Sequence, residues 1–245
     1  MMWTGRKVGR KIGPDQQIRK NAAGPAGKTT PEAKGRGKIR EYAEAFAVAL
    51  LIALLVRTFV VQAFKIPSGS MEKTLLVGDH IFVNKFLYGY HLPLTKGRVL
   101  GYSKPVKGDI IVFVFPEDPG KDFIKRVIAV PGDTVEIRQK RVLLNGTPIE
   151  EKYSRFADGN TIDGFVRTRD NMEKITVPPG KYFVMGDNRD RSYDSRFWGF
   201  VDEDAILGKA MVIYFSIDWS LEVRWYEVWR YPELVRWDRV GDVLR

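Results

Sequence analysis

The sequence predicts a mainly β protein, in which an antiparallel-sheet body follows one N-terminal transmembrane helix. One apolar stretch near the N-terminus approaches the length of a membrane helix, and no later stretch of the 245 residues matches it. After residue 65, short runs of β-branched and aromatic residues alternate with turn residues. No long segment with a 3.6-residue period occurs between residue 65 and the tryptophan-rich end, which disfavours a parallel fold of alternating strands and helices.

Positive charge is concentrated at the N-terminus. The chain has 40 Lys and Arg against 30 Asp and Glu, a net charge of +10. Residues 1–40 hold 11 of the basic and 2 of the acidic residues, so the remainder is close to neutral. This glycine-rich basic stretch has little to bury and is predicted to be a disordered tail. A basic arm can bind nucleic acid, but this one runs directly into an apolar segment. We therefore interpret it as a cytoplasmic tail and predict no nucleic-acid partner.

Residues 41–64 are predicted to be a transmembrane signal-anchor. The 12 apolar residues at 45–56 are fewer than the about 20 that a span needs. Residues 42–64 together would form a helix of about 34 Å, with Arg57 near the outer headgroups. This predicts a single-pass protein of the cell (inner) membrane, with a cytoplasmic N-terminus, the lipid bilayer as partner and residues 65–245 as an extracytoplasmic domain.

Two alternatives to an anchor remain open. A buried amphipathic helix is disfavoured because the segment is apolar on all faces. A cleavable signal peptide is suggested by the small-residue pattern of Val61-Gln62-Ala63. The long tail and Arg57 argue against it.

The predicted strands cover residues 79–85, 108–115, 135–138, 141–144, 181–185 and 210–215. Gln139-Lys140 and Asn145-Gly146 are expected to form tight turns. Residues 150–178 are polar and weakly patterned and are interpreted as a surface hairpin or a small insertion, and the insertion as a whole is predicted at residues 134–179. The end of the chain, residues 219–245, is rich in tryptophan. We expect these side chains to hold the tail on the body rather than to form a membrane belt: Trp219, Trp225, Trp229 and Trp237.

A serine and a lysine are the candidate catalytic pair. Ser70 lies between Gly69 and Met71 in a Pro-Ser-Gly-Ser-Met turn, where a tight backbone can expose a hydroxyl and aim N–H groups at one point. The chain has no cysteine and only two histidines, in contexts that suggest no chemistry, so a lysine is the natural base. Lys125 has apolar neighbours, and burial can lower a lysine pKa by up to about 3–5 units. Taken alone, the motif around Ser70 also fits an ordinary surface turn. Lys125, taken alone, also fits a solvated lysine on a strand.

A third candidate segment is the polar loop at residues 186–199. It also fits a simple turn with internal ion pairs. A calcium loop starting at Asp190 would need glycine at its sixth position and glutamate at its twelfth, where the chain has Ser195 and Val201. Three arginines also oppose a cation, so we predict no metal and no cofactor.

These segments together resemble the ordered motifs of bacterial type I signal peptidases, also called leader peptidases. The resemblance runs from the anchor to about residue 215 and rests on residues 67–75, Gly78-Asp79, residues 125–133 and residues 186–199. It implies a Ser/Lys dyad, with Ser70 as nucleophile and Lys125 as general base. It also implies that the Ser68 hydroxyl and the Ser70 N–H hold the oxyanion. Supporting roles are implied for Ser192 beside the Lys125 amine, Asp187 paired with Arg126, and Asp194 with Arg196.

The expected function is that of a membrane-bound serine endopeptidase that removes signal peptides from secretory preproteins after small residues, in an Ala-x-Ala pattern. Shallow pockets lined by Ile66, Met71 and Leu75 are expected to accept these small residues. The chain departs from some members in having one evident span and a compact region before residue 186. Two other functions are possible alternatives on the sequence: a self-cleaving Ser/Lys protein of the SOS-repressor type, and a membrane-tethered β-rich binding or scaffold protein without catalysis.

Overall fold

A computed structural model describes residues 34–91, 98–99, 101–161, 168–224 and 226–244. Most of the predicted tail, residues 1–33, and Trp225 lie outside the described residues. The chain separates into two units, residues 1–47 and 48–245. Helix α1 (Lys34–Phe59) contains the boundary between them, and the strands all belong to the second unit.

Helix α1 differs at both ends from the predicted anchor at 41–64. It begins at Lys34, among residues that were assigned to the tail, and ends at Phe59. It ends there because strand β1 (Val61–Lys65) follows and pairs with β2 along its whole length. Large apolar side chains in its second half are about half exposed, such as Leu51 at 58% and Ile52 at 55%. Among the described residues, we find no helix with both the length and the apolar character of a membrane span.

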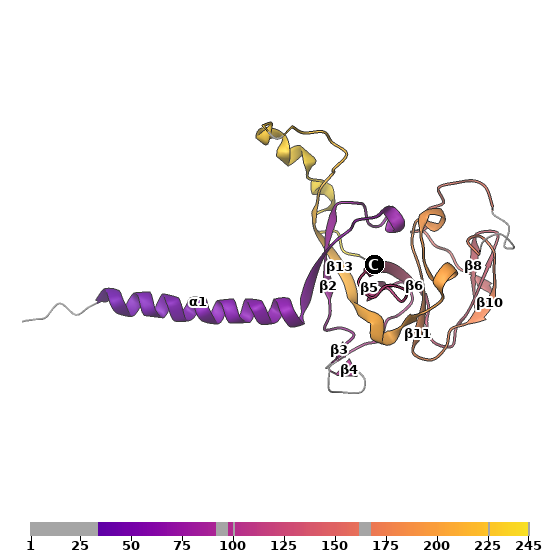
Figure 1. The fold of residues 1–245 in the computed structure, drawn as a ribbon, viewed down its shortest axis with the longest axis horizontal. Helices are drawn as coiled ribbons and strands as arrows, with labels where there is room; N and C mark the ends of the chain where they lie inside the picture. The colour runs from indigo at the N-terminus through magenta and orange to yellow at the C-terminus, as the bar shows by residue number, and fades with distance from the viewer. Residues whose placement is uncertain (1–33, 92–97, 100, 162–167, 225, 245) are drawn as a thin grey trace, which may run out of the picture. The chain divides into compact units, whose positions relative to one another are not determined.

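Antiparallel sheets dominate the second unit, which confirms the predicted mainly β class (Figure 1). Within the described residues, seven strands form the main sheet in the order β1-β2-β13-β5-β6-β11-β12. They are β1, β2 (Asp79–Asn84), β13 (Ile206–Ser216), β5 (Ile110–Val114), β6 (Asp122–Ala129), β11 (Lys181–Met185) and β12 (Val201–Asp202). Four strands form a second sheet in the order β10-β7-β8-β9: β10 (Met172–Thr176), β7 (Thr134–Arg138), β8 (Arg141–Leu144) and β9 (Thr147–Pro148). A two-stranded ribbon joins β3 (Tyr90–His91) to β4 (Arg98–Val99).

The helices of the second unit, apart from α1, are short. They are α2 (Ser195–Trp198) and the 3-10 helices η1 (Gly69–Met71), η2 (Arg189–Arg191), η3 (Glu203–Ala205), η4 (Val228–Leu234) and η5 (Trp237–Arg239). Two of them, η1 and η2, lie in the segments that the sequence marks as chemically important, and they contact each other.

The main sheet is buried on both faces. Along β5, Ile110 and Val112 join one apolar cluster while Ile111 and Phe113 join another, because successive strand residues point to opposite faces. A third cluster combines residues of β6 and β11 with residues of β7 and β8 and so packs the second sheet on the first. The functional segments are thus attached to a rigid core.

The predicted strands are present, and seven further strands of the described residues lie outside the predicted ranges: β1, β3, β4, β6, β9, β10 and β12. Strand β1 had been assigned to the membrane helix, because its apolar residues continue the apolar stretch. Strand β6 was not recognised, although it carries Lys125. Strand β10 lies in the weakly patterned region at 150–178, and its pairing with β7 has an irregular register.

Of the tryptophans expected to hold the C-terminal tail on the body, the structure describes Trp219, Trp229 and Trp237, which are 59%, 71% and 65% exposed. Trp219 contacts the body, because the Lys65 Nζ of β1 lies 5.3 Å from its ring centroid. The tail is also held by arginine contacts to a buried carboxylate and by backbone pairing of residues 241–244 with β13. Leu244, which is 7% exposed, joins the apolar cluster beneath the main sheet.

Candidate active site

Ser70 lies in the loop that joins β1 to β2. Backbone hydrogen bonds close this loop: the Ile66 N–H donates to the Asp79 carbonyl at 2.8 Å, and the Gly78 N–H donates to the Ile66 carbonyl at 3.1 Å. Met71 is fully buried, whereas Ser70 remains partly exposed. The buried Met71 side chain therefore fixes the turn, while the hydroxyl of Ser70 stays accessible.

Lys125 reaches Ser70 from β6. Its Nζ lies 2.9 Å from the Ser70 Oγ and donates to the Ile124 carbonyl at 2.9 Å. Only 3% of Lys125 is exposed. Burial lowers the pKa of this amine from 10.5 to about 8, because an ammonium group loses its hydration there; nearby Asp194 and Asp187 oppose this shift. Near neutral pH about a tenth of the amine is therefore unprotonated, far more than for a lysine with its ordinary pKa.

Both side chains open into a cleft of about 530 Å³. Ser68, which is exposed, also lines it, together with Pro67, Gly69, Glu72, Asp122, Phe123, Ile124, Asn188, Arg191 and Tyr193. The expected pocket residues Ile66, Met71 and Leu75 are at most 2% exposed and do not line the cleft, because their side chains fill the core.

One wall of the cleft is a strand edge. Residues 122–125 of β6 pair with β5, whereas β11 pairs with β6 only from Arg126 onward. Within the described residues, the register thus gives this part of β6 no strand partner on its other side.

Arg126 and Asp187 form a buried ion pair beside Ser70 and Lys125. The Arg126 Nε and Nη2 donate to the two Asp187 carboxylate oxygens at 2.9 and 2.8 Å, and both side chains are at most 2% exposed. The Thr74 hydroxyl, from the Ser70 loop, donates to the same carboxylate at 2.5 Å. This ion pair therefore joins β6, the Ser70 loop and the loop at 186–199.

Asp194 and Arg196 form a second buried pair inside the loop. Arg196 donates through Nε and Nη2 to Asp194, at 2.8 Å each, and the Gly186 N–H donates to Asp194 at 3.0 Å. Burial alone would raise the pKa of Asp194, but the Arg196 charge and hydrogen bonds hold that pKa below its ordinary value. The carboxylate stays ionised and also caps the N-terminus of α2.

Ser192 is buried at the same place but lacks the expected contact with Lys125. Among the described residues its hydroxyl has no hydrogen-bond partner of good geometry, although it lies close enough to Asp194 to help lower that pKa. The Lys125 amine is directed to Ser70 and to the Ile124 carbonyl instead. A methyl group on Gly186 would come within 2.2 Å of the Ser192 Oγ and 2.4 Å of the Ser70 carbonyl. Ser192 thus packs beside the turn that carries Ser70.

Comparison with known proteins decides the family. The family described as "Signal peptidase, peptidase S26" matches residues 39–215, most of the chain. The chain belongs to this signal peptidase family. It is 38% identical over 206 residues to a signal peptidase I of Pseudomonas fluorescens, which covers 72% of each chain. A signal peptidase I of Aquifex aeolicus is 38% identical over 229 residues, covering 72% of this chain and 84% of that protein. The predicted function is confirmed: the chain is a serine peptidase that removes signal peptides.

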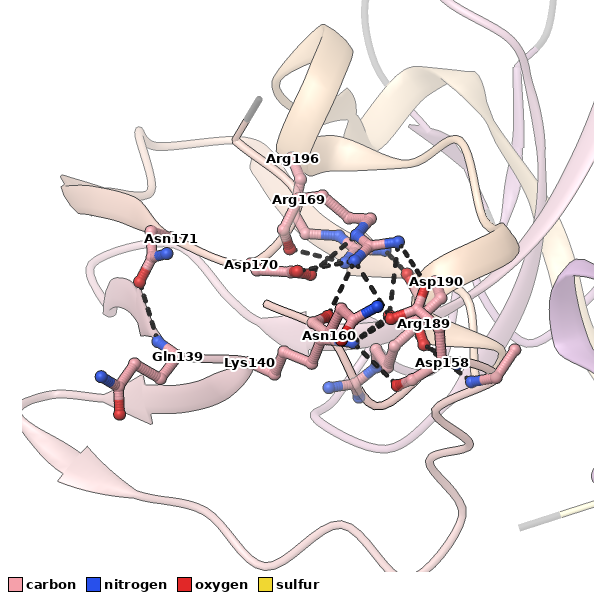
Figure 2. A network of polar contacts seen from close by, with 11 residues as sticks. Gln139, Lys140, Asp158, Asn160, Arg169, Asp170, Asn171, Arg189, Asp190 and Arg196 are labelled. Carbon is pink, nitrogen blue, oxygen red and sulfur yellow. Dashed lines mark hydrogen bonds and ion pairs between the residues drawn. The ribbon is translucent and has the colours of Figure 1, made fainter. Parts of the chain in front are cut away.

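The structure of this chain also contains a polar network, most of whose residues the sequence did not single out (Figure 2). Lys140, in the β7–β8 turn, contacts Asp158 at 2.7 Å and Asp190 at 3.0 Å. Asp190, which the sequence marked as the start of a possible calcium loop, also accepts hydrogen bonds from the backbone N–H groups of Ala157 and Asp158.

The same network continues to the loop at 186–199. Arg169 binds Asp170 and Asp158, and its carbonyl accepts a hydrogen bond from Arg196. The network ties the second sheet to this loop. Its partners are far apart along the chain, so no local pattern indicates them.

Proposed function

We propose that Ser70 is the nucleophile and Lys125 the general base of signal-peptide removal. One observation carries the proposal: a buried amine lies 2.9 Å from the Ser70 hydroxyl, and burial lowers its pKa to about 8. A lysine with an ordinary pKa of about 10.4 would be almost fully protonated at neutral pH and could not accept a proton. The Lys125 environment removes this obstacle.

The proposed reaction has two halves. Unprotonated Lys125 takes the proton of the Ser70 hydroxyl while the oxygen attacks the scissile carbonyl, forming a tetrahedral intermediate. Lys125 then gives this proton to the leaving amine, the C–N bond breaks, and the signal peptide remains as an ester on Ser70. In the second half Lys125 activates a water molecule, which attacks the ester and releases the signal peptide.

The Ser70 N–H and the Ser68 hydroxyl are proposed to hold the oxyanion. Ser68 lines the cleft beside Ser70 and has an extended backbone, with φ −135° and ψ 155°. The sequence between them contains Gly69, which leaves the approach to these donors free of a side chain. Loss of one such donor typically costs about 10²–10³ in rate.

Three supporting roles are proposed. The Arg126–Asp187 pair holds β6 and the Ser70 loop together through Thr74. The Asp194–Arg196 pair braces the loop at 186–199. The Ser192 hydroxyl is proposed to accept a hydrogen bond from the ammonium that forms when Lys125 gains the proton, since it is buried near Ser70 and has no partner of good geometry among the described residues.

Secretory preproteins are proposed to bind as an added β-strand. The unpaired edge of β6 at residues 122–125 borders the cleft, and backbone hydrogen bonds to such an edge accept many sequences. Specificity for small residues in an Ala-x-Ala pattern then depends on the side chains that line the cleft. Phe123 and Ile124 are the apolar ones on this edge.

We also propose that α1 anchors the protein in the cell membrane, with the N-terminus in the cytoplasm and the domain from residue 65 outside. The charge of residues 1–40 and the exposed apolar side chains of α1 support this orientation. Ser70 follows the end of α1 at Phe59 by 11 residues, at most about 40 Å of extended chain, which limits its distance from the lipid surface. Exposed Trp219 and Trp229 suit the membrane–water interface.

Cleavage of a preprotein in detergent tests the dyad. Ser70→Ala and Lys125→Ala are expected to abolish cleavage, and Lys125→Arg is expected to be equally inactive because arginine keeps its proton. Ser103→Ala, at an exposed serine whose hydroxyl only contacts the next carbonyl, is the matched control and should cleave like wild type. Activity that survives the loss of Ser70 or Lys125 rules out the dyad. Failure of the wild type to cleave any preprotein favours the scaffold alternative.

A further inference from the structure

The C-terminal tail contacts the loop that carries Ser70. Arg239, which is 14% exposed, donates from Nη2 to the Asp79 carboxylate at 2.6 Å and from Nε at 3.2 Å. Its Nη2 also donates to the Thr74 carbonyl at 2.9 Å. One planar guanidinium thus bridges two points of the loop at residues 67–78. The family match ends at residue 215, so it assigns no role to this tail.

Asp79 is the closing point of that loop. It is fully buried, and its carboxylate accepts hydrogen bonds from the Leu76 N–H at 2.8 Å and the Ser216 hydroxyl at 2.6 Å. Burial alone would raise the pKa of Asp79, but the hydrogen bonds from Arg239 and Ser216 hold that pKa below its ordinary value. The tail therefore binds an ionised group at the base of the Ser70 loop.

Thr74 connects this contact to the site. Its carbonyl faces Arg239, and its hydroxyl donates to Asp187 at 2.5 Å. Asp187 in turn holds Arg126, the neighbour of Lys125 on β6. A continuous series of hydrogen bonds thus leads from Arg239 through the Ser70 loop to the strand that carries the base.

Apolar packing supports the same connection independently. Leu244, near the end of the tail, belongs to the buried cluster that contains Met71 and Leu75 of the Ser70 loop. Its N–H donates to the Met211 carbonyl of β13 at 2.8 Å. The tail therefore completes the core on which the loop rests.

We infer that Arg239 is a positioning residue, which holds the Ser70 loop so that the serine hydroxyl meets the Lys125 amine. The inference rests on the proposed Ser/Lys dyad. Arg239 lies outside the cleft and acts through Asp79 and Thr74. A displacement of about 1 Å at reacting atoms costs about 10²-fold in rate, so loss of this bridge affects kcat more than KM.

Arg239→Gln in the full-length protein tests the inference, with Arg230→Gln as the matched control. Arg230 lies in the same tail, and its ion pairs among the described residues are local, with Glu227 and Glu233. The Arg239 variant should fold, because Asp79 keeps Ser216 and Arg236, whose Nη1 lies 3.5 Å away. We expect kcat for a preprotein to fall by about 10²-fold with little change in KM, and the control to match wild type. Hydrogen exchange should rise at residues 67–78 but not at residues 134–144.

Arg239→Lys tests the bridge itself, because an ammonium keeps the charge but lacks the fork that reaches Asp79 and Thr74 together. We expect Arg239→Lys to lose most of the kcat that Arg239→Gln loses. A kcat like that of Arg230→Gln, or unchanged exchange at residues 67–78, overturns the inference. Hydrogen exchange does not depend on catalysis, so an incorrect dyad, seen as cleavage by Ser70→Ala, is distinguished from an incorrect role for Arg239.

Discussion

Lys125 lies among two carboxylates and an arginine, and the balance of these charges explains why burial controls its pKa. Asp194 and Asp187 favour the ammonium, and Arg196 opposes it. Each carboxylate is already held by an arginine through two hydrogen bonds, so little net negative charge remains for the lysine. The buried ion pairs therefore organise the site without restoring the ordinary lysine pKa.

Gly186 is the residue whose replacement tests the close packing of the site. A methyl group there would lie 2.2 Å from the Ser192 Oγ and 2.4 Å from the Ser70 carbonyl. We expect Gly186→Ala to displace the serine turn and to reduce kcat by about 10²-fold or more in a cleavage assay. Gly159→Ala is the control, because a methyl group at Gly159 has no heavy atom of the described residues within 4 Å. Equal activity of both variants would contradict the packing described for Ser70.

At the level of elements, the β7–β8 turn shows how a distant contact fixes a local conformation. Gln139 and Lys140 have φ values of +48° and +67°, which a two-residue turn of this type requires but which usually favour glycine or asparagine. Lys140 is held there by Asp158 and Asp190. The turn therefore connects the second sheet to the loop at 186–199.

Lys140→Met is expected to destabilise the fold, because it leaves the nearly buried Asp190 without its main cation. The loss should be about 1–3 kcal/mol in the free energy of unfolding, measured by urea denaturation. Lys174→Met, on the exposed side of β10, is the control and should change stability little. The interpretation of the network is incorrect if both variants lose the same free energy.

Elements with a local pattern were predictable from the sequence, and elements defined by distant partners were not. Strands β2, β5, β8 and β11 follow from β-branched and aromatic runs between turn residues. Strand β1 was missed because its apolar residues continue those of α1, and only its pairing with β2 distinguishes it. The motif around Ser70 was found, but the roles of Thr74 and Arg239 depend on contacts that span more than 100 positions.

On the scale of the whole molecule, burying the Lys125 amine has a cost that depends on pH. Its pKa is about 8 in the folded protein and 10.5 when exposed. Below pH 8 both states carry the proton, so folding must bury an ammonium and the full penalty applies. As pH rises from 8 to 10.5 only the unfolded state keeps the proton, and the stability of the folded state increases.

Lys125→Met is therefore expected to be more stable than wild type near neutral pH, by up to about 3 kcal/mol, because burial lowers the lysine pKa from 10.5 to about 8. The difference should shrink as pH approaches 10.5. Urea denaturation at several pH values measures it, and Lys121→Met at an exposed lysine provides the control. A difference that stays constant over this range contradicts the assigned pKa.

The pH dependence of kcat/KM for preprotein cleavage tests the central claim most directly, since only unprotonated Lys125 can accept the Ser70 proton. We expect kcat/KM to rise about tenfold per pH unit at low pH, to bend near the lysine pKa of about 8, and to be constant above it. A profile that is flat from roughly pH 6 to pH 10, or one that bends only near 10.5, would contradict a buried lysine base.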